Sequence, residues 1–416
     1  MNEETSSKED NLVKKPIAKI SRNVWILTAT SFLTDISSEM LINLIPLFLA
    51  NVLGASTAII GLIEGVAEST ASVMKVFSGA LSDKIGKRKG LAVIGYGLSA
   101  LAKPFLYFST TWVWVLAVRF SDRLGKGIRT APRDALLAGS VTEERRGLAF
   151  GVQRAGDTAG AMLGMIIAAL IIWRTQANAE LLSANTFRII VLASIIPAIL
   201  AVLVLAFGAR EIQQKSKTNL PFLSLKGMDN RFKAFLAVSI LFTLGNSSDA
   251  FIILRGQERG LSTLQIMAML ITFNFVYSVL STPAGALSDR IGRRRLILGG
   301  WITYALIYLG FAVSKTGTEI WLVFGLYGVF YALTEGAGKA FIADLVPAEK
   351  RGTAYGLYHA AVGLSAFPAS VIAGLLWQGA GSWQGFGPSA PFYFGAAMAM
   401  VAGIMFLIFV RPIKQS

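Results

Sequence analysis

One stretch of the chain, "RFSDRLGKGIRTAPRD" at 119–134, places charged and polar side chains at helical spacing. Arg119, Arg123, Lys126, Thr130 and Arg133 follow one another at intervals of four, three, four and three residues. Such intervals put the side chains along one stripe of a helix. A stripe of cations can bind an anionic group, or it can pair with carboxylates from a neighbouring helix.

Carboxylates occur at the same kind of spacing. Asp35 and Glu39 are four residues apart, as are Glu64 and Glu68, and residues four apart share a helix face. A further acid, Asp157, follows Arg154 three residues later. These acids are candidate partners for the basic stripe, and a carboxylate in such a network can also take up and release a proton.

The composition identifies the solvent around these helices. The chain has 416 residues, of which 54% are hydrophobic and 15% charged, and its mean hydropathy is +0.59. Apolar runs such as 191–207 and 392–410 approach the roughly 20 residues that a helix needs to cross a bilayer. The sequence therefore predicts an integral membrane protein, in which charges at membrane depth must face a wet cavity or a partner of opposite charge.

The basic residues give the orientation. The net charge is +15, but the cations gather in every second loop rather than on one surface, which argues against nucleic-acid binding. This positive-inside pattern predicts that both termini are cytoplasmic. The first 20 residues are polar and lack the apolar core of a signal peptide, so we expect a disordered cytoplasmic tail.

Apolar runs between turn signals predict an all-α protein with twelve transmembrane helices. We expect an N-terminal six-helix bundle at 21–208, a cytoplasmic interdomain loop at 209–230 and a C-terminal six-helix bundle at 231–412. The helices are expected to begin near residues 24, 59, 91, 112, 148, 187, 232, 263, 296, 320, 353 and 391.

The two halves resemble each other. "GALSDKIGKRK" at 79–89 returns as "GALSDRIGRRR" at 285–295, and "EERRGLAFG" at 143–151 returns as "AEKRGTAYG" at 348–356. "SSE" at 37–39 in the first helix also corresponds to "SSD" at 247–249 in the seventh. An internal duplication of this kind is typical of secondary transporters, whose substrate site lies between the halves near the middle of the membrane.

The repeated loops resemble the signature loop of the major facilitator superfamily, and the resemblance extends over about residues 20 to 412. It implies two pseudo-symmetric six-helix bundles and a cytoplasmic gate, in which Asp83 and Asp289 latch the cytoplasmic side shut. Matching glycines permit close helix contact and a tight turn. The arginines of the loops either belong to this gate or only set the topology. The gate residues are Gly79, Asp83, Gly86, Arg88, Gly285, Asp289, Gly292 and Arg294.

The resemblance also implies that helices one, two, four and five of a half are neighbours. Arg119 falls where the family commonly has a buried arginine linked to proton coupling, although Asp122 and Arg123 differ from the Gln-Gly that often follows. We therefore assign proton coupling to Asp35, Glu39, Arg119 and Asp157. The alternative, that these charges only neutralise one another and hold the bundle together, stays open.

Other polar residues of the predicted helices are candidates for the substrate cavity. Glu335 and Lys339 are four residues apart and can also simply pair, and a lone His359 is often only a hydrogen-bonded structural group. The glycine spacing "GDTAGAMLG" at 156–164 suits close helix packing. The candidate cavity residues are Glu64, Glu68, Arg123, Lys126, Arg154, Asn246, Asp249, Asn274, Glu335, Lys339 and His359.

The sequence thus predicts a proton-coupled transporter of small organic molecules in the cell inner membrane, working by alternating access as a monomer. We expect efflux of drugs or metabolites by antiport. The alternative is a proton symporter that imports an organic anion, nutrient or siderophore. The chain has no cysteine and one histidine, so we expect no enzyme, no metal site and no cofactor. The partners are the substrate, protons and the lipid bilayer.

Overall fold

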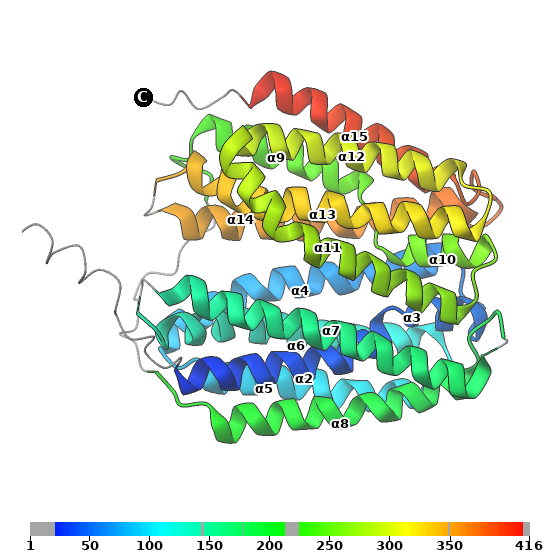
Figure 1. Cartoon of the computed structure of the whole chain (residues 1–416), viewed down its shortest axis with the longest axis horizontal. Helices are drawn as coiled ribbons and strands as arrows, with labels where there is room; N and C mark the ends of the chain where they lie inside the picture. The colour runs from blue at the N-terminus through cyan, green and yellow to red at the C-terminus, as the bar shows by residue number, and fades with distance from the viewer. Residues whose placement is uncertain (1–20, 143–144, 178, 213–223, 348–349, 411–416) are drawn as a thin grey trace, which may run out of the picture.

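The computed structural model describes residues 21–142, 145–177, 179–212, 224–347 and 350–410, and it is almost entirely helical (Figure 1). The helices of the first half are α2 (Arg22–Ile42), α3 (Ile45–Asn51), α4 (Thr57–Ile85), α5 (Lys89–Ala102), the 3-10 helix η2 (Lys103–Phe108), α6 (Trp112–Gly139), α7 (Arg146–Gln176) and α8 (Ala184–Gly208). Those of the second half are α9 (Asn230–Gly245), α10 (Ala250–Glu258), α11 (Thr263–Ile291), α12 (Arg293–Val313), α13 (Gly317–Leu345), α14 (Arg351–Gln378) and α15 (Ala390–Phe409).

These elements make twelve crossings, because α2 with α3, α5 with η2, and α9 with α10 each form one crossing. The predicted helix starts are confirmed, and the largest differences are three residues, as for 187 against Ala184, 296 against Arg293 and 320 against Gly317. Within the described residues, eleven crossings are long and apolar enough to span a membrane by composition alone. The remaining crossing is α6, which carries the basic stripe.

Figure 1 shows the helices α2 to α8 packed as one bundle and α9 to α15 as another. We call the end of the molecule where α2 begins and α15 ends the terminal end, and the opposite end the far end. The bundles meet mainly through α4 against α14 and α7 against α11, and more weakly through α3 against α10. At the far end the Thr57 amide donates to Gln378 Oε1 at 2.9 Å, and the Thr263 amide donates to the Glu180 carbonyl at 3.2 Å.

Glycines allow the closest of these helix contacts. A Cβ added to Gly61 or Gly65 of α4 would clash with the backbone of α14, at Ser370 and Phe367 respectively. The glycine spacing on α7 works in the same way within the first half, because Gly160 and Gly164 lie against backbone carbonyls of α2. The predicted close packing of segment 156–164 is therefore confirmed.

The seventh crossing is broken. Asn246 and Asp249 were expected on a continuous helix, but α9 ends at Gly245 and α10 begins at Ala250. The intervening Asn-Ser-Ser-Asp consists of residues that favour turns, because their short polar side chains compete for backbone hydrogen bonds. The equivalence of "SSE" and "SSD" is thus one of sequence only, since Ser37–Glu39 lies inside the regular helix α2.

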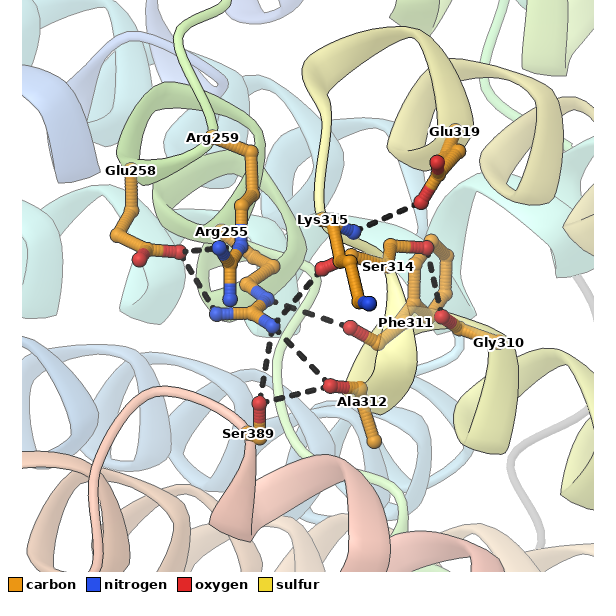
Figure 2. A network of polar contacts seen from close by, with 10 residues as sticks. All are labelled: Arg255, Glu258, Arg259, Gly310, Phe311, Ala312, Ser314, Lys315, Glu319 and Ser389. Carbon is orange, nitrogen blue, oxygen red and sulfur yellow. Dashed lines mark hydrogen bonds and ion pairs between the residues drawn. The ribbon is translucent and has the colours of Figure 1, made fainter.

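Arg255 fixes the short helix α10 in the second half (Figure 2). Its side chain is fully buried, and its guanidinium donates to the carbonyls of Phe311, Ala312 and Ser314 at 3.1–3.3 Å, at the far end of α12. It also donates to Ser389 Oγ at 2.9 Å and pairs with Glu258 at 2.7 Å. A cation at the carbonyl end of a helix satisfies otherwise unpaired acceptors, so this network ties α10 to α12 and to the start of α15.

Candidate functional site

The basic stripe of α6 faces the carboxylates of α4. Arg119 Nη2 lies 2.8 and 2.7 Å from the two carboxylate oxygens of Glu64, and both side chains are buried. One turn further, Arg123 lies 3.2 Å from Glu68, whose side chain is 46% exposed. The structure thus brings these predicted acids and bases together, and the pairs remove much of the cost of holding charges at membrane depth.

A small chamber of about 60 Å³ lies inside the first half, beside these pairs. It is lined by Asp35 and Glu39 of α2 and by Arg119 and Lys126 of α6. Lys103, which the sequence analysis did not single out, also lines it, and this buried ammonium donates to Ser37 Oγ at 2.6 Å and to Ser38 Oγ at 3.1 Å. The signal that could have identified Lys103 was its position as the one charged residue of the apolar run 91–108, since an ionisable group within a transmembrane segment is usually functional.

Asp157 does not share this chamber. It lies on α7, and in the described part of the chain its buried Oδ1 has no hydrogen-bond partner. The last member of the stripe, Arg133, pairs with its neighbour Asp134 at 2.8 Å and donates to Ser31 Oγ at 3.2 Å. Three of the four predicted proton-coupling residues therefore line one space, and the fourth, Asp157, does not line it.

A cavity of about 540 Å³ lies between the two halves near their middle and is here called the central cavity. The first half contributes charged side chains, and the second half contributes the carboxylate of Asp249 together with polar and aromatic side chains from the broken crossing, α11 and α13. The residues used below are Glu39, Glu64, Glu68 and Arg123 from the first half and Asn246, Asp249, Phe273, Asn274, Phe324 and Tyr331 from the second.

The break that precedes Asp249 is held by tyrosines. The hydroxyls of Tyr304, Tyr308 and Tyr327 lie 3.3–3.4 Å from Asn246 Oδ1. Tyr308 and Tyr327 can donate to the two lone pairs of this oxygen, and the Tyr304 hydroxyl also lies 3.1 Å from the Gly245 carbonyl, so the three tyrosines together hold the non-helical segment where it borders the central cavity. The tyrosines sit at helical intervals on α12 and at one position of α13, but the sequence does not reveal that they converge.

The remaining predicted cavity residues lie closer to the terminal end. Arg154 of α7 donates to the Tyr277 hydroxyl at 2.9 Å and pairs with Glu335 of α13 at 3.3 Å. Glu335 also accepts a hydrogen bond from Tyr277 and pairs with Lys339 at 3.1 Å. Arg154 was expected to belong with Asp157 in the first half, but its partners come from the second half, so this cluster bridges the bundles. It borders a cavity of about 680 Å³.

His359 lines neither the central cavity nor the cavity of about 680 Å³. It lines a cavity of about 350 Å³ inside the second half, which shares Asn246 with the central cavity and shares Lys339 and Glu335 with the cavity of about 680 Å³. Lys126, also predicted for the substrate cavity, lines the small chamber instead. Over the described ranges, no three His, Asp or Glu side chains form a group that could hold a metal ion.

The two signature loops lie at the terminal end. Gly86 and Gly292 have φ angles of 70° and 89° and end α4 and α11, which is where the predicted tight turns were placed. In the first loop Arg88 Nη2 lies 3.7 Å from Asp83, whose side chain is 40% exposed, and Arg88 also donates to the Ala135 carbonyl of α6 at 2.9 Å. Gly79 packs against α6, since an added Cβ would lie 3.3 Å from Ala131.

The second loop makes different contacts. Arg294 donates to the carbonyls of Val410 and Leu407 at 2.8 and 3.1 Å, and so caps the end of α15. Arg293 pairs with Asp344 of α13. Gly285 has open space around its Cα, and the side chain of Asp289 lies outside what the structure describes.

Comparisons with known proteins agree with this architecture. The family model of the Major Facilitator Superfamily matches residues 27–262 and 234–416. An uncharacterised MFS-type transporter of Methanocaldococcus jannaschii is 37% identical over 396 residues, which cover 94% of this chain and 95% of the relative. A multi-drug resistance efflux pump of Streptococcus pneumoniae is 25% identical over 327 residues, covering 76% and 78% of the two chains.

The fold is also that of solved transporters. The crystal structure of a variant of the nucleoside transporter NupG superposes with a TM-score of 0.78 at 15% identity, over 94% of this chain and all of that one. With two six-helix bundles, a cavity between them and a family model that matches almost the whole chain, this multi-pass membrane protein belongs to the major facilitator superfamily of secondary transporters.

Proposed function

We propose that this protein is a proton-coupled transporter that exports small organic molecules across the cell inner membrane, using the central cavity as its substrate site. The observation that carries the proposal is the position of Glu39. Its carboxylate borders both the central cavity and the small chamber, accepts a hydrogen bond from Asn43 at 3.0 Å, and forms no ion pair within the described residues. A carboxylate without a fixed counter-charge can be neutralised by a proton.

In this mechanism Asp35 and Glu39 carry the proton, and Arg119 and Asp157 assist. Protonation of Glu39 removes a negative charge from the wall of the central cavity, which changes the affinity of the cavity for a charged substrate. The Arg119–Glu64 pair holds the chamber open beside them, because two buried charges at this distance fix the spacing of α4 and α6. Proton binding and substrate binding are thereby coupled through one space.

Alternating access follows from the contacts between the halves. Glycine-lined packing of α4 on α14 and the Thr57–Gln378 contact close the far end, whereas at the terminal end the exposed carboxylate of Asp83 forms new contacts when that end closes. We assign the terminal end to the cytoplasm, because the basic loops gather there. The division into a tail at 1–20, bundles at 21–208 and 231–412 and a loop at 209–230 stays a prediction, and residues 1–20 and 213–223 lie outside the described residues.

Export is the proposed direction because the relative from Streptococcus pneumoniae is named an efflux pump. The alternative, proton symport that imports an organic anion, nutrient or siderophore, draws on the basic stripe of α6. That support is weaker in the structure, because Arg119 and Arg123 are both paired with carboxylates.

The test is substrate-dependent proton flux in liposomes that contain the purified protein and a pH-sensitive dye. A panel of drugs, organic acids and siderophores is added under a proton gradient. We expect protons to move opposite to the substrate, and Asp35→Asn and Glu39→Gln to abolish driven accumulation while substrate exchange continues. Glu180→Gln, at an exposed position of the far end, serves as the matched control.

Proton movement together with the substrate would replace export by the symport alternative. Unchanged driven transport in both Asp35→Asn and Glu39→Gln would refute the proposed proton carriers.

A further inference from the structure

We propose that the central cavity binds a small organic cation, such as a protonated amine or a quaternary ammonium. Asp249 is its counter-charge, and the aromatic side chains of the cavity contact the cation. The inference rests on the proposed function only in taking this cavity as the substrate site. It names the chemical class of the substrate.

The charges around the cavity are unequal. Four carboxylates line it, those of Glu39, Glu64, Glu68 and Asp249, against the single cation Arg123. Glu68 is neutralised by Arg123, and Glu64 by Arg119 behind it. Two carboxylates out of four are therefore without an ion-pair partner in the part of the chain that the structure describes.

These two carboxylates differ in their surroundings. Glu39 also borders the small chamber, where the cations Lys103 and Lys126 lie. Asp249 comes from the other half of the molecule, and that chamber does not reach it. Asp249 is thus an unpaired carboxylate, among the described residues, that borders the cavity from the second half, whereas the guanidinium of Arg123, the one cation of the lining, is already paired with Glu68.

Three aromatic side chains, Phe273, Phe324 and Tyr331, line the same cavity. Phe273 of α11 lies with its ring centroid 4.9 Å from that of Phe324 and 5.4 Å from that of Tyr331, in an edge-to-face arrangement with the latter. The faces of such rings carry partial negative charge and attract cations within about 6 Å, which is the basis of quaternary ammonium recognition. Nearby, Asn274 offers an amide as a further polar contact.

The backbone on both sides of Asp249 is held by hydrogen bonds. Asp249 precedes α10, which Arg255 ties to α12 and α15, and it follows the Asn246 break that the three tyrosines hold. A carboxylate on a fixed backbone loses little conformational freedom when a ligand binds, which favours affinity. The volume of about 540 Å³ suits a small drug-sized molecule.

The absence of cysteine from the chain permits a direct test of the cavity's charge. A single cysteine is introduced as Ala366→Cys, at a lining position on α14 outside the charged groups. Its reaction rates with the trimethylammonioethyl and sulfonatoethyl methanethiosulfonates are measured in detergent, and the ratio of the rates is divided by the ratio for a free thiol. The control is Thr158→Cys, which lines the cavity of about 680 Å³ together with the cations Arg154 and Lys339 and the carboxylate of Glu335.

We expect the normalised cation-to-anion ratio at Ala366→Cys to be on the order of ten, because the nearby carboxylates attract the cationic reagent and repel the anionic one. It should exceed the ratio at Thr158→Cys. Asp249→Asn should lower it severalfold, and Asp249→Glu should retain it. Glu39→Gln, which removes the other carboxylate of the cavity that is unpaired among the described residues, should also lower the ratio. Size-exclusion profiles verify that each variant is folded.

Protection completes the test. Phenyltrimethylammonium should slow the labelling of Ala366→Cys, and benzenesulfonate should not, with the protection lost in Asp249→Asn. A normalised ratio at or below one, a ratio unaffected by Asp249→Asn, or protection by benzenesulfonate alone would overturn the inference. Because no proton gradient is used, these results are independent of whether the protein is an antiporter.

Discussion

The buried pair Arg119–Glu64 should be far more important for stability than the neighbouring pair Arg123–Glu68. Both side chains of the first pair are nearly inaccessible, at 3% and 7% exposed, and one guanidinium nitrogen contacts both carboxylate oxygens. Removing one partner leaves an uncompensated buried charge, which costs roughly 3–5 kcal/mol of unfolding free energy. We therefore expect Glu64→Gln and Arg119→Gln each to lose about that much.

The double variant Glu64→Gln/Arg119→Gln distinguishes an ion pair from two independent effects. Since it leaves no unpaired charge, its loss should fall below the sum of the single losses by about 2 kcal/mol or more. The matched control is the cycle on Arg123 and Glu68, in which Arg123 is as buried as Arg119, at 3% exposed, but Glu68 is 46% exposed and keeps its contact with water, so the coupling should be smaller, at about 1 kcal/mol.

The assay is reversible unfolding in mixed detergent micelles, followed by circular dichroism for each variant of both cycles. Equal coupling energies in the two cycles would refute the reasoning, because burial would then not decide the strength of the pairs. A Glu64→Gln variant as stable as the unmodified protein would refute it as well.

Further predictions concern the other contacts of the fold. Arg255→Met should lower the unfolding free energy by roughly 2–4 kcal/mol, because several carbonyls at the end of α12 lose their donor; the same unfolding assay measures it. Gly65→Ala should destabilise the α4–α14 contact by about 1–3 kcal/mol, whereas Gly97→Ala, which has open space around it, should be neutral or slightly stabilising. Arg154→Gln should change stability by less than about 1 kcal/mol, since its side chain is 58% exposed, yet widen the separation of the bundles at the terminal end. Pulsed electron spin resonance between labels on α7 and α13 measures that separation, and an unchanged distribution would mean that the contact with Glu335 does not bridge the halves in solution.

The sequence predicted the crossings well because apolar length and turn residues are local properties. It also predicted that the cations of α6 share one face and meet either a wet cavity or carboxylates, since helical spacing fixes which side chains share a face, and the structure pairs Arg119 and Arg123 with carboxylates. The partner of Arg154 could not be predicted in this way. Glu335 lies 181 residues away in the other bundle, and only the packing of the two halves decides that they meet.

The break in the seventh crossing could have been predicted from the sequence. Gly245 and the following Asn-Ser-Ser-Asp form a cluster of turn residues inside an apolar run, which is a signal of a break. The apolar surroundings concealed it, because a single hydropathy criterion treats the run as one helix. The structural role of Arg255 was not predicted for a related reason. In a sequence, a cation near a helix end is indistinguishable from a solvent-exposed residue, because its buried acceptors are not known.

The pairing of α6 with α4 also bears on how the protein is made. A helix with this many charges is unfavourable in lipid on its own, since each central Arg or Lys costs about 2.5–3.5 kcal/mol on insertion scales. During synthesis α4 emerges before α6, so Glu64 and Glu68 are already available when the basic helix reaches the membrane. Insertion of α6 then depends on a neighbour that precedes it in the chain, and the order of the helices becomes part of the information that builds the first bundle.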